Sequence, residues 1–297
     1  MTNISVWARA VRVRFLLASV IGVTTGLTIS WSGGMFDPFY AIITYFGVIS
    51  LHASVDLLND YFDYKSGIDL ITIKTPFSGG TGVLPDETLN PSQVYLVGMI
   101  FLIIGVGVGI YLAFVRGLFI IPLVGLAALS TYFYSTRLAN YGLGELFVAI
   151  KGMLIVVGTY YVQTISITLS SLYTGAVLGL LSASVLFMNE FPDYDADKEK
   201  NRKNLVVRLG RERSKKIFII FPLLIYSLIA IGVSISILHL LSLASFLTIP
   251  LYVRSYRGLS IFFKDANGLV PTMANNVLTS RIIGLVIAIS FLFPTIV

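Results

Sequence analysis

The stretch Val94–Val115, VYLVGMIFLIIGVGVGIYLAFV, contains 22 consecutive residues without a charge. An α-helix rises about 1.5 Å per residue, so this stretch is long enough to cross the roughly 30 Å hydrocarbon core of a bilayer. The rest of the chain has the same character. Of its 297 residues 56% are hydrophobic and 12% are charged, whereas soluble domains carry about 25% charged residues. The composition therefore predicts an all-α, polytopic membrane protein.

Apolar stretches of similar length predict nine transmembrane helices in total. They lie at Phe15–Trp31, Pro38–Leu57, Val94–Val115, Leu118–Tyr134, Leu146–Ile167, Leu172–Met188, Ile217–Ile235, Ile237–Tyr252 and Val277–Val297. The seventh and eighth are separated on grounds of length, because the 37 residues Ile217–Val253 as one helix would extend about 55 Å. We expect a tight turn near Ile235–Ile237 instead.

Basic residues set the expected orientation. Of the 21 Lys and Arg residues, 18 fall on one side of these spans, and only Arg116 lies in a connection on the opposite side. The positive-inside rule then predicts a protein of the cell membrane with the N-terminus and the long polar loops in the cytoplasm and the C-terminus outside. Topology accounts for the net charge of +6, so the lipid bilayer is an expected partner and nucleic acid is not.

The chain has no cysteine and only two histidines, His52 and His239. Thiol catalysis, disulfide scaffolds and Cys-ligated metals are thereby excluded, and a His-rich metal site or a Ser–His–Asp hydrolase is not favoured.

The acidic residues are concentrated in two segments that open with similar sequences. Twelve of the 15 Asp and Glu residues lie in Asp56–Glu87 and Glu190–Glu212. Asn59–Tyr64 reads NDYFDY and Asn189–Tyr194 reads NEFPDY, each where an apolar helix reaches the cytoplasmic side. The two lie four spans apart, which predicts parallel pseudo-repeats of about 1–140 and 141–297 within one domain, 1–297. We expect loops 58–92 and 189–216 to cap a site.

The spacing of the polar residues indicates a cation site. Asn59 and Asp63 lie four residues apart, on one face of a helix, and Asn189, Asp193 and Asp197 extend a matching stripe. If the stripes face each other, with no basic residue directly between them, their oxygens repel unless cations neutralise them. Oxygen ligands at a polar rim favour Mg²⁺ that bridges to substrate phosphates. Nearby bases, above all Lys151 within a span, suit a diphosphate.

These segments resemble the two aspartate-rich signatures of the UbiA superfamily of membrane prenyltransferases. The resemblance rests on Asn59–Asp69 (NDYFDYKSGID) and Asn189–Gly210 (NEFPDYDADKEKNRKNLVVRLG), and it includes Tyr132–Glu145 and Arg12–Gly26. Gly67-Ile68-Asp69 and Ser78-Gly79-Gly80 resemble the branches that make menaquinone and related quinones. Three positions depart from the commoner pattern. Gly67 stands where the family has an Asp, with Asp69 as a substitute, and Glu190 replaces an Asp. Lys151 stands where quinone-type members often have a non-basic residue, although other members use a lysine near this point for the diphosphate.

The resemblance implies nine helices around a central cavity and Mg²⁺ bridging an isoprenyl diphosphate such as geranylgeranyl diphosphate. Prenyl transfer to a hydroxylated aromatic acceptor would pass through an allylic carbocation. The expected residues fall into three groups. Metal ligands are Asn59, Asp60, Asp63, Asn189, Glu190, Asp193 and Asp197. Substrate is bound by Asn59, Lys151, Arg12, Arg14, Arg137, Tyr61, Ser78 and Arg202. Catalytic residues are Asp63, Asp193, Lys151 and Tyr134, the tyrosine shielding the carbocation, as Tyr61, Tyr64 and Tyr194 would also do.

Two alternatives remain from the sequence. One is prenyl transfer to a glyceryl phosphate in ether-lipid synthesis. The other is a secondary transporter, which the near absence of acids from the spans disfavours, because transporters place ionisable residues near the bilayer midplane.

Overall fold

The longer helices begin and end at residues suited to those positions, as α3 (Pro38–Ser66) illustrates. The Asp37 side chain accepts hydrogen bonds from the backbone N–H groups of Phe39 (2.8 Å) and Tyr40 (3.3 Å), and Pro38 occupies the first turn. The helix ends at Gly67, whose φ of 78° lies in the left-handed region that glycine adopts without a steric penalty.

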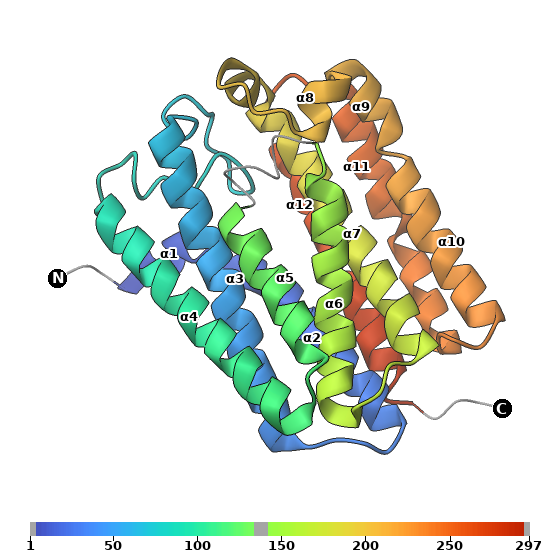
Figure 1. Cartoon of the computed structure of the whole chain (residues 1–297). Coiled ribbons are helices and arrows are strands. Elements are labelled where there is room, and N and C mark those ends of the chain that lie inside the picture. Colours follow the sequence, from blue (N-terminus) through green and yellow to red (C-terminus); the bar gives the residue numbers. More distant parts are fainter. Residues whose placement is uncertain (1–3, 134–141, 294–297) are drawn as a thin grey trace.

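The computed structural model describes residues 4–133 and 142–293, and within them it contains helices and no strands. The elements are α1 (Ile4–Ala10), α2 (Val13–Ser32), α3, α4 (Pro91–Arg116), α5 (Ile120–Phe133), α6 (Gly144–Thr164), α7 (Leu169–Glu199), α8 (Leu205–Leu209), α9 (Arg211–Ile217), α10 (Ile220–Ser234), the 3₁₀ helix η2 (Leu240–Thr248), α11 (Ile249–Phe262) and α12 (Val270–Ser290). The long helices form one bundle, with α8 and α9 at one end of it (Figure 1).

The all-α, membrane-spanning architecture is confirmed. Seven helical segments of the described chain are long and apolar enough to cross a membrane. They correspond to α2, α3, α4, α6, α7, the continuous stretch Arg211–Ser234 and α12, while the apolar helix α5 is shorter. Large apolar side chains face outward on them, for example Phe114, which is 77% exposed. The count of nine spans stays a prediction.

One predicted helix, Ile237–Tyr252, is wrong in form. A turn follows α10 at the expected place, but the segment then divides into η2 and α11. His239 caps the start of η2, because its Nδ1 accepts a hydrogen bond from the backbone N–H of Leu241 (3.1 Å), and Pro250 lies in the first turn of α11. Proline favours the first turn of a new helix because it lacks the N–H that a helix interior requires.

Small residues let the central helices approach closely. A Cβ atom at Gly179 of α7 would overlap the carbonyl oxygen of Ala149 on α6, so only glycine fits there. Helix α6 packs along α7, α3 packs along α4, and α2 contacts α6 and α12. Close packing through small residues is a main source of helix association in a bilayer. It fixes the relative positions of α2, α3, α6 and α7, which carry the site described below.

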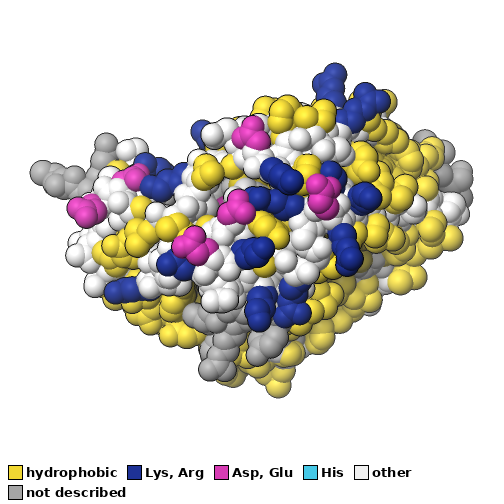
Figure 2. Space-filling model, turned by 90° about the horizontal axis from the view of Figure 1, so that it is seen from above, with side chains coloured by type: hydrophobic (Ala, Val, Ile, Leu, Met, Phe, Trp, Pro, Cys, Tyr) yellow, Lys and Arg dark blue, Asp and Glu magenta, His cyan; other side chains and the backbone are white. Residues whose placement is uncertain are grey.

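The predicted cap loops begin later than expected. Helix α3 continues to Ser66 and α7 to Glu199, so the connections run from residue 67 to 90 and from residue 200 onward. The asparagine and aspartate of each signature lie on one helical face and do not end the helices, and α7 continues through Pro192, which has no backbone N–H to donate. Both connections lie at the end of the bundle that carries α8 and α9 (Figure 1). Lys, Arg, Asp and Glu side chains gather on this end, above hydrophobic sides (Figure 2).

Candidate active site

The first signature projects from the last turns of α3 into a cavity. Asn59 and Asp63 both line this cavity, and the Asn59 Nδ2 donates a hydrogen bond to Asp63 Oδ2 (3.1 Å). Asp63 is buried, with 6% of its surface exposed. The predicted placement of these two residues on one face of a helix therefore agrees with the structure.

The second signature faces the same cavity from α7. Asn189, Glu190, Asp193 and Asp197 line it, although Pro192 lies within the same helix. Asn189 Oδ1 and Asp193 Oδ1 are buried and have no hydrogen-bond partner. Glu190 instead accepts a hydrogen bond from the backbone N–H of Val206 (3.2 Å), at the start of α8. The two stripes thus face each other, and the second presents unsatisfied oxygens.

A basic residue lies between the stripes, contrary to the sequence-based expectation. Arg202 donates from Nη1 to Asp63 Oδ2 (3.0 Å), its Nη2 lies 3.0 Å from Asp63 Oδ1, and its Nη1 lies 3.7 Å from Asp197 Oδ1. The turn after α7 explains this position, because the Arg202 N–H bonds to the Asp197 carbonyl (2.7 Å) and returns the chain over the cavity. Arg202 therefore joins the first signature to the second.

The connection after α3 covers the first signature. Asp69, Ser78, Gly79 and Gly80 line the cavity. Gly80 has a φ of 72°, and a Cβ atom there would lie 2.5 Å from Asp69 Oδ2, so the backbone can approach this carboxylate only with glycine. Burial, together with the neighbouring carboxylates of Asp63 and Asp60, raises the pKa of Asp69 to about 8. The loop thus brings a third acidic group to the first signature.

Arg12, at the junction of α1 and α2, closes another side of the cavity. It has a φ of 45°, and its Nη2 donates to Asp60 Oδ1 (2.6 Å). Burial disfavours the guanidinium, but the carboxylates of Asp60 and Asp56 outweigh it and raise the pKa of Arg12. Asp60 does not line the cavity, and it also accepts hydrogen bonds from Thr81. Its position therefore does not support the expected role as a metal ligand: it holds Arg12 and the loop in place.

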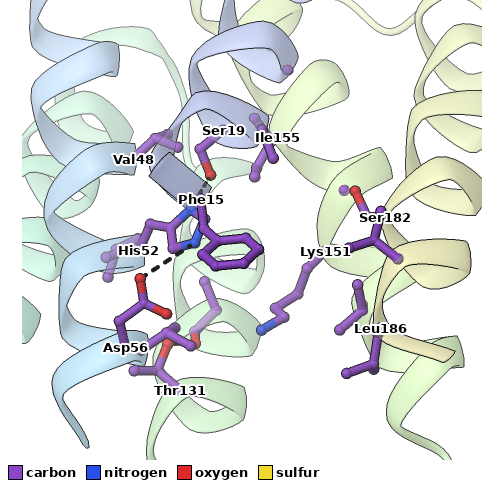
Figure 3. Close-up of a pocket in the computed structure, with 18 of the residues that line it drawn as sticks. Phe15, Ser19, Val48, His52, Asp56, Thr131, Lys151, Ile155, Ser182 and Leu186 are labelled. Atoms are coloured by element: carbon purple, nitrogen blue, oxygen red, sulfur yellow. Dashed lines mark hydrogen bonds and ion pairs between the residues drawn. The ribbon is translucent and has the colours of Figure 1, made fainter. Parts of the chain in front are cut away.

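The cavity extends from this polar end deep between the helices. Its volume is about 500 Å³. The deeper part is mainly apolar and is lined by Val48, Leu51, Val108, Leu112, Leu123 and Ile155, among others. Lys151 of α6 also lines it, and Figure 3 shows its side chain extending into the space toward α3. The cavity therefore offers a charged end for anions and an apolar channel for a hydrocarbon chain.

Several predicted site residues lie elsewhere. Arg14 is exposed, and its backbone carbonyl accepts a hydrogen bond from Arg281. Tyr61 packs against Tyr95, with ring centroids 4.8 Å apart, and Tyr194 stacks beneath Arg211. Neither tyrosine lines the cavity, nor does Tyr64. These aromatic rings sit on helix faces turned toward other helices or charges. Tyr134 and Arg137 lie outside the described residues.

The sequence of the chain matches the UbiA prenyltransferase family over residues 19–262. The chain belongs to this family. It is therefore a membrane prenyltransferase, and the transporter alternative is not supported.

Individual relatives of this UbiA prenyltransferase act on naphthalene derivatives by name. The 1,4-dihydroxy-2-naphthoate octaprenyltransferase of Escherichia coli (strain K12) is 28% identical over 217 residues, covering 71% of this chain and 70% of the relative. The 2-carboxy-1,4-naphthoquinone phytyltransferase of Synechocystis sp. is 28% identical over 238 residues, covering 76% and 73%. A UbiA homolog from Archaeoglobus fulgidus, solved with GPP and Mg²⁺, shares the fold with a TM-score of 0.60 at 14% identity, covering 97% and 99%.

The donor atoms of the UbiA signatures suit Mg²⁺ in kind. Within residues 4–133 and 142–293, no three carboxylate or imidazole groups form a ready-made metal cluster. Mg²⁺, however, takes few protein ligands and completes its coordination with water and substrate phosphates. Buried oxygens without hydrogen-bond partners, Asn189 Oδ1 and Asp193 Oδ1, are of the type that it prefers. The residues present therefore fit this cation.

The cavity residues of this UbiA member that were not predicted from the sequence include Ser19, His52 and Asp56. His52 and Asp56 continue the stripe of Asn59 and Asp63 on α3 at intervals of three and four residues. That spacing is a signal present in the sequence. It is easily overlooked because His52 lies inside an apolar run and Asp56 lies at its end, outside the repeated phrase.

Proposed function

We propose that this UbiA prenyltransferase moves a polyprenyl group from an isoprenyl diphosphate to a hydroxylated aromatic ring, with Mg²⁺ as cofactor. The observation that carries the proposal is one cavity that joins two acidic stripes and four basic side chains, those of Arg12, Lys151, Arg202 and Arg281, to an apolar channel. The names of the relatives, which transfer prenyl or phytyl chains to naphthalene rings, support the aromatic acceptor.

The polar end suits the diphosphate of the donor. Arg12, Lys151 and Arg202 all line the cavity and supply fixed positive charge for phosphate oxygens. Asn59, Asp63, Asn189, Asp193 and Asp197 would hold Mg²⁺. When bound, the metal ion neutralises negative charge that develops on the leaving diphosphate. Ser78 and the glycines beside it cover this end of the cavity.

The apolar channel suits the rest of the reaction. Loss of diphosphate leaves an allylic carbocation, which water would quench, so the surrounding side chains must exclude water. Val48, Leu51 and Ile155 provide such a surface. An electron-rich ring then forms the new C–C bond and releases a proton. The roles of Tyr134 and Arg137 in this step stay predictions.

Incubation of the purified protein with geranylgeranyl diphosphate, Mg²⁺ and a panel of acceptors tests the proposal. The panel contains a dihydroxynaphthoate, a monohydroxybenzoate and a glyceryl phosphate, with products identified by mass. We expect prenylated arene and one diphosphate per product, and no product in EDTA. Prenylation of the glyceryl phosphate alone would overturn the aromatic acceptor, and metal-independent turnover would overturn the cofactor.

The site should face the cytoplasm at the cell membrane. The chain has no cysteine, so single cysteines report orientation without background. Lys203→Cys lies beside the acidic end, and Ser166→Cys lies between α6 and α7 at the other end. In intact cells a membrane-impermeant maleimide should label Ser166→Cys only. Labelling of Lys203→Cys instead would reverse the orientation.

A further inference from the structure

A second group of polar side chains lies in the cavity on the interior side of Asn59. His52 Nδ1 lies 2.7 Å from Ser19 Oγ of α2, and His52 Nε2 lies 3.8 Å from Asp56 Oδ2. Figure 3 shows the three residues in a row along one wall, with Lys151 extending from the opposite wall. Ser19, His52, Asp56 and Lys151 all line the cavity.

Packing does not account for the Asp56 carboxylate. Asp56 is 7% exposed, and its Oδ2 is buried without a hydrogen-bond partner. An ionisable group within a membrane-spanning helix is costly, and such residues usually serve a function. Asp56 also stands apart from the acidic stripes that face the diphosphate, because it lies one turn deeper along α3 than Asn59, toward the apolar channel.

The reaction requires a proton acceptor at this depth. When a hydroxylated ring attacks the allylic carbon, one proton must leave the acceptor for each C–C bond formed. The channel walls are mainly apolar, so Asp56 is one of few side chains at this depth that can accept that proton. A base is effective when it lies within hydrogen-bond reach of the proton in the bound substrate.

We propose that Asp56 accepts the hydroxyl proton of the aromatic acceptor, and that His52, paired with Ser19 and with its Nε2 3.8 Å from Asp56 Oδ2, limits where this carboxylate can lie. This inference rests on the proposed function. As the donor C–O bond breaks, its electron pair leaves with diphosphate. A π pair of the ring forms the C–C bond, and the acceptor O–H proton passes to an Asp56 oxygen. The ring C–H proton then moves to the ring oxygen as aromaticity returns. One proton remains on Asp56 and leaves with diphosphate and product.

Three charged side chains act on Asp56. Arg12 and Lys151 are the basic groups that act on its carboxylate, and Asp60 is the neighbouring acid. A different role for Asp56, as a counter-charge that only orients Lys151 toward the diphosphate, would place its effect on donor binding instead.

The test compares Asp56→Asn with the unsubstituted protein on hydroxyarenes of graded hydroxyl acidity. The full chain is assayed with geranylgeranyl diphosphate and Mg²⁺. We expect kcat to fall by about 10²–10⁴-fold with weakly acidic hydroxyarenes. Acceptors already ionised at the assay pH should recover most of the lost rate, and the donor KM should change less than about threefold. Unchanged donor affinity also shows that the variant is folded.

Two further variants complete the test. His52→Gln should lower kcat by about tenfold. As in Asp56→Asn, the loss of kcat should be larger for weakly acidic acceptors than for acceptors that are already ionised. Asp195→Asn removes an exposed aspartate of α7 that pairs with Arg211 outside the cavity, and it should change neither quantity.

An equal loss of rate in Asp56→Asn with every acceptor, ionised or not, would overturn the base assignment. So would a raised donor KM at unchanged kcat, which would make Asp56 the counter-charge of Lys151. If the unsubstituted protein prenylates no hydroxyarene, the proposed function fails first and takes this inference with it. The two failures are thereby distinguished.

Discussion

The two acidic signatures have the same spacing but are neutralised in different ways. At the first, Asp63 is held by Arg202 and Asp60 by Arg12. At the second, Asn189 Oδ1 and Asp193 Oδ1 are buried without a hydrogen-bond partner. Buried oxygens that lack a partner are costly, so the second signature has the greater need for a cation. If Mg²⁺ binds as proposed, we expect it to bind more tightly at Asn189 and Asp193 of α7 than at Asp63, which Arg202 already pairs with.

Substitution of Asp193 should have the largest effect. Asp193→Ala removes the least satisfied carboxylate of the second signature, and we expect kcat/KM to fall by at least about a thousandfold. This corresponds to roughly 4 kcal/mol of transition-state stabilisation. Diphosphate release at increasing Mg²⁺ concentration measures it. Asp195→Asn, an exposed aspartate two residues away, is the matched control. Mg²⁺-dependent turnover in Asp193→Ala would remove this residue from the metal site.

Arg202→Gln tests whether arginine neutralises the first signature. Without the guanidinium, Asp63 and Asp197 lose their shared positive partner, so Mg²⁺ should bind more tightly in the absence of donor. The donor KM should rise by about 10–100-fold, because a charged contact to the diphosphate is lost. Calorimetry with Mg²⁺ and steady-state kinetics measure both effects. Arg213→Gln, on an exposed part of α9, is the control. Weaker Mg²⁺ binding in Arg202→Gln would contradict the comparison.

Lys151→Met tests whether Lys151 binds the donor diphosphate or only extends its charge toward the membrane surface. Lys151 lines the cavity from α6, a helix that carries neither signature. We expect the donor KM to rise by about tenfold, with Mg²⁺ affinity little changed, because a single charge on phosphate is lost. Methionine keeps the length and apolar packing of the side chain. If donor affinity is unchanged, the lysine only extends its charge toward the membrane surface.

The sequence predicted the parts of this molecule that depend on local pattern. Apolar length located most of the helices, and the i, i+4 spacing placed Asn59 with Asp63 and Asn189 with Asp193 on cavity-facing stripes. These predictions succeed because helical periodicity fixes which residues share a face. The cost of a charge inside an apolar span indicated a functional role for Lys151, which lines the cavity.

Contacts between segments that are distant in the sequence could not be predicted from helical periodicity. Arg202 reaches Asp63 across 139 residues, and Asp60 is taken from the expected metal site by Arg12, 48 residues earlier. Both contacts depend on how the chain turns after a helix.

Tyr61 and Tyr194 do not line the cavity, although the sequence predicted that they would shield the carbocation. The position of a tyrosine on a helix does not determine which neighbouring side chain its ring contacts.

Gly80→Ala should affect the first signature more moderately. Its φ of 72° and the 2.5 Å separation between an added Cβ atom and Asp69 Oδ2 mean that alanine must displace the loop or the carboxylate. Strain of this kind costs about 1–3 kcal/mol. We expect an activity loss of about tenfold. This loss should exceed the part that reduced thermal stability, measured as the fall in thermal midpoint, can explain. Gly107→Ala, where nothing lies within 4 Å of the added atom, is the control. Unchanged activity in Gly80→Ala would mean that this loop does not shape the site.

The outer edge of the same loop should matter least. The Lys74 Nζ donates to Asp86 Oδ1 (2.6 Å), and this hydrogen bond lowers the pKa of Asp86 from its ordinary value. A lowered pKa means that the pair stabilises the fold above the ordinary pKa of aspartate, about 3.9, and that this stabilisation is lost as the pH falls below it. Both side chains are well exposed, at 38% and 43%, so the contribution should be under about 1 kcal/mol.

Asp86→Asn should therefore lower the thermal midpoint in detergent by no more than about 3 °C at pH 7, and by less at pH 4. Activity should stay within about twofold, because the Asp86–Lys74 pair fastens the loop only at its solvent side. The same carboxylate lies 3.8 Å from Arg9 of α1, so Arg9→Gln should give a smaller shift in the same direction. A tenfold loss of activity in Asp86→Asn would show instead that the position of the whole loop, beyond Gly80 and Asp69, controls the first signature. The first signature would then differ from the second through the position of the loop that covers it as well as through its pairing with arginine.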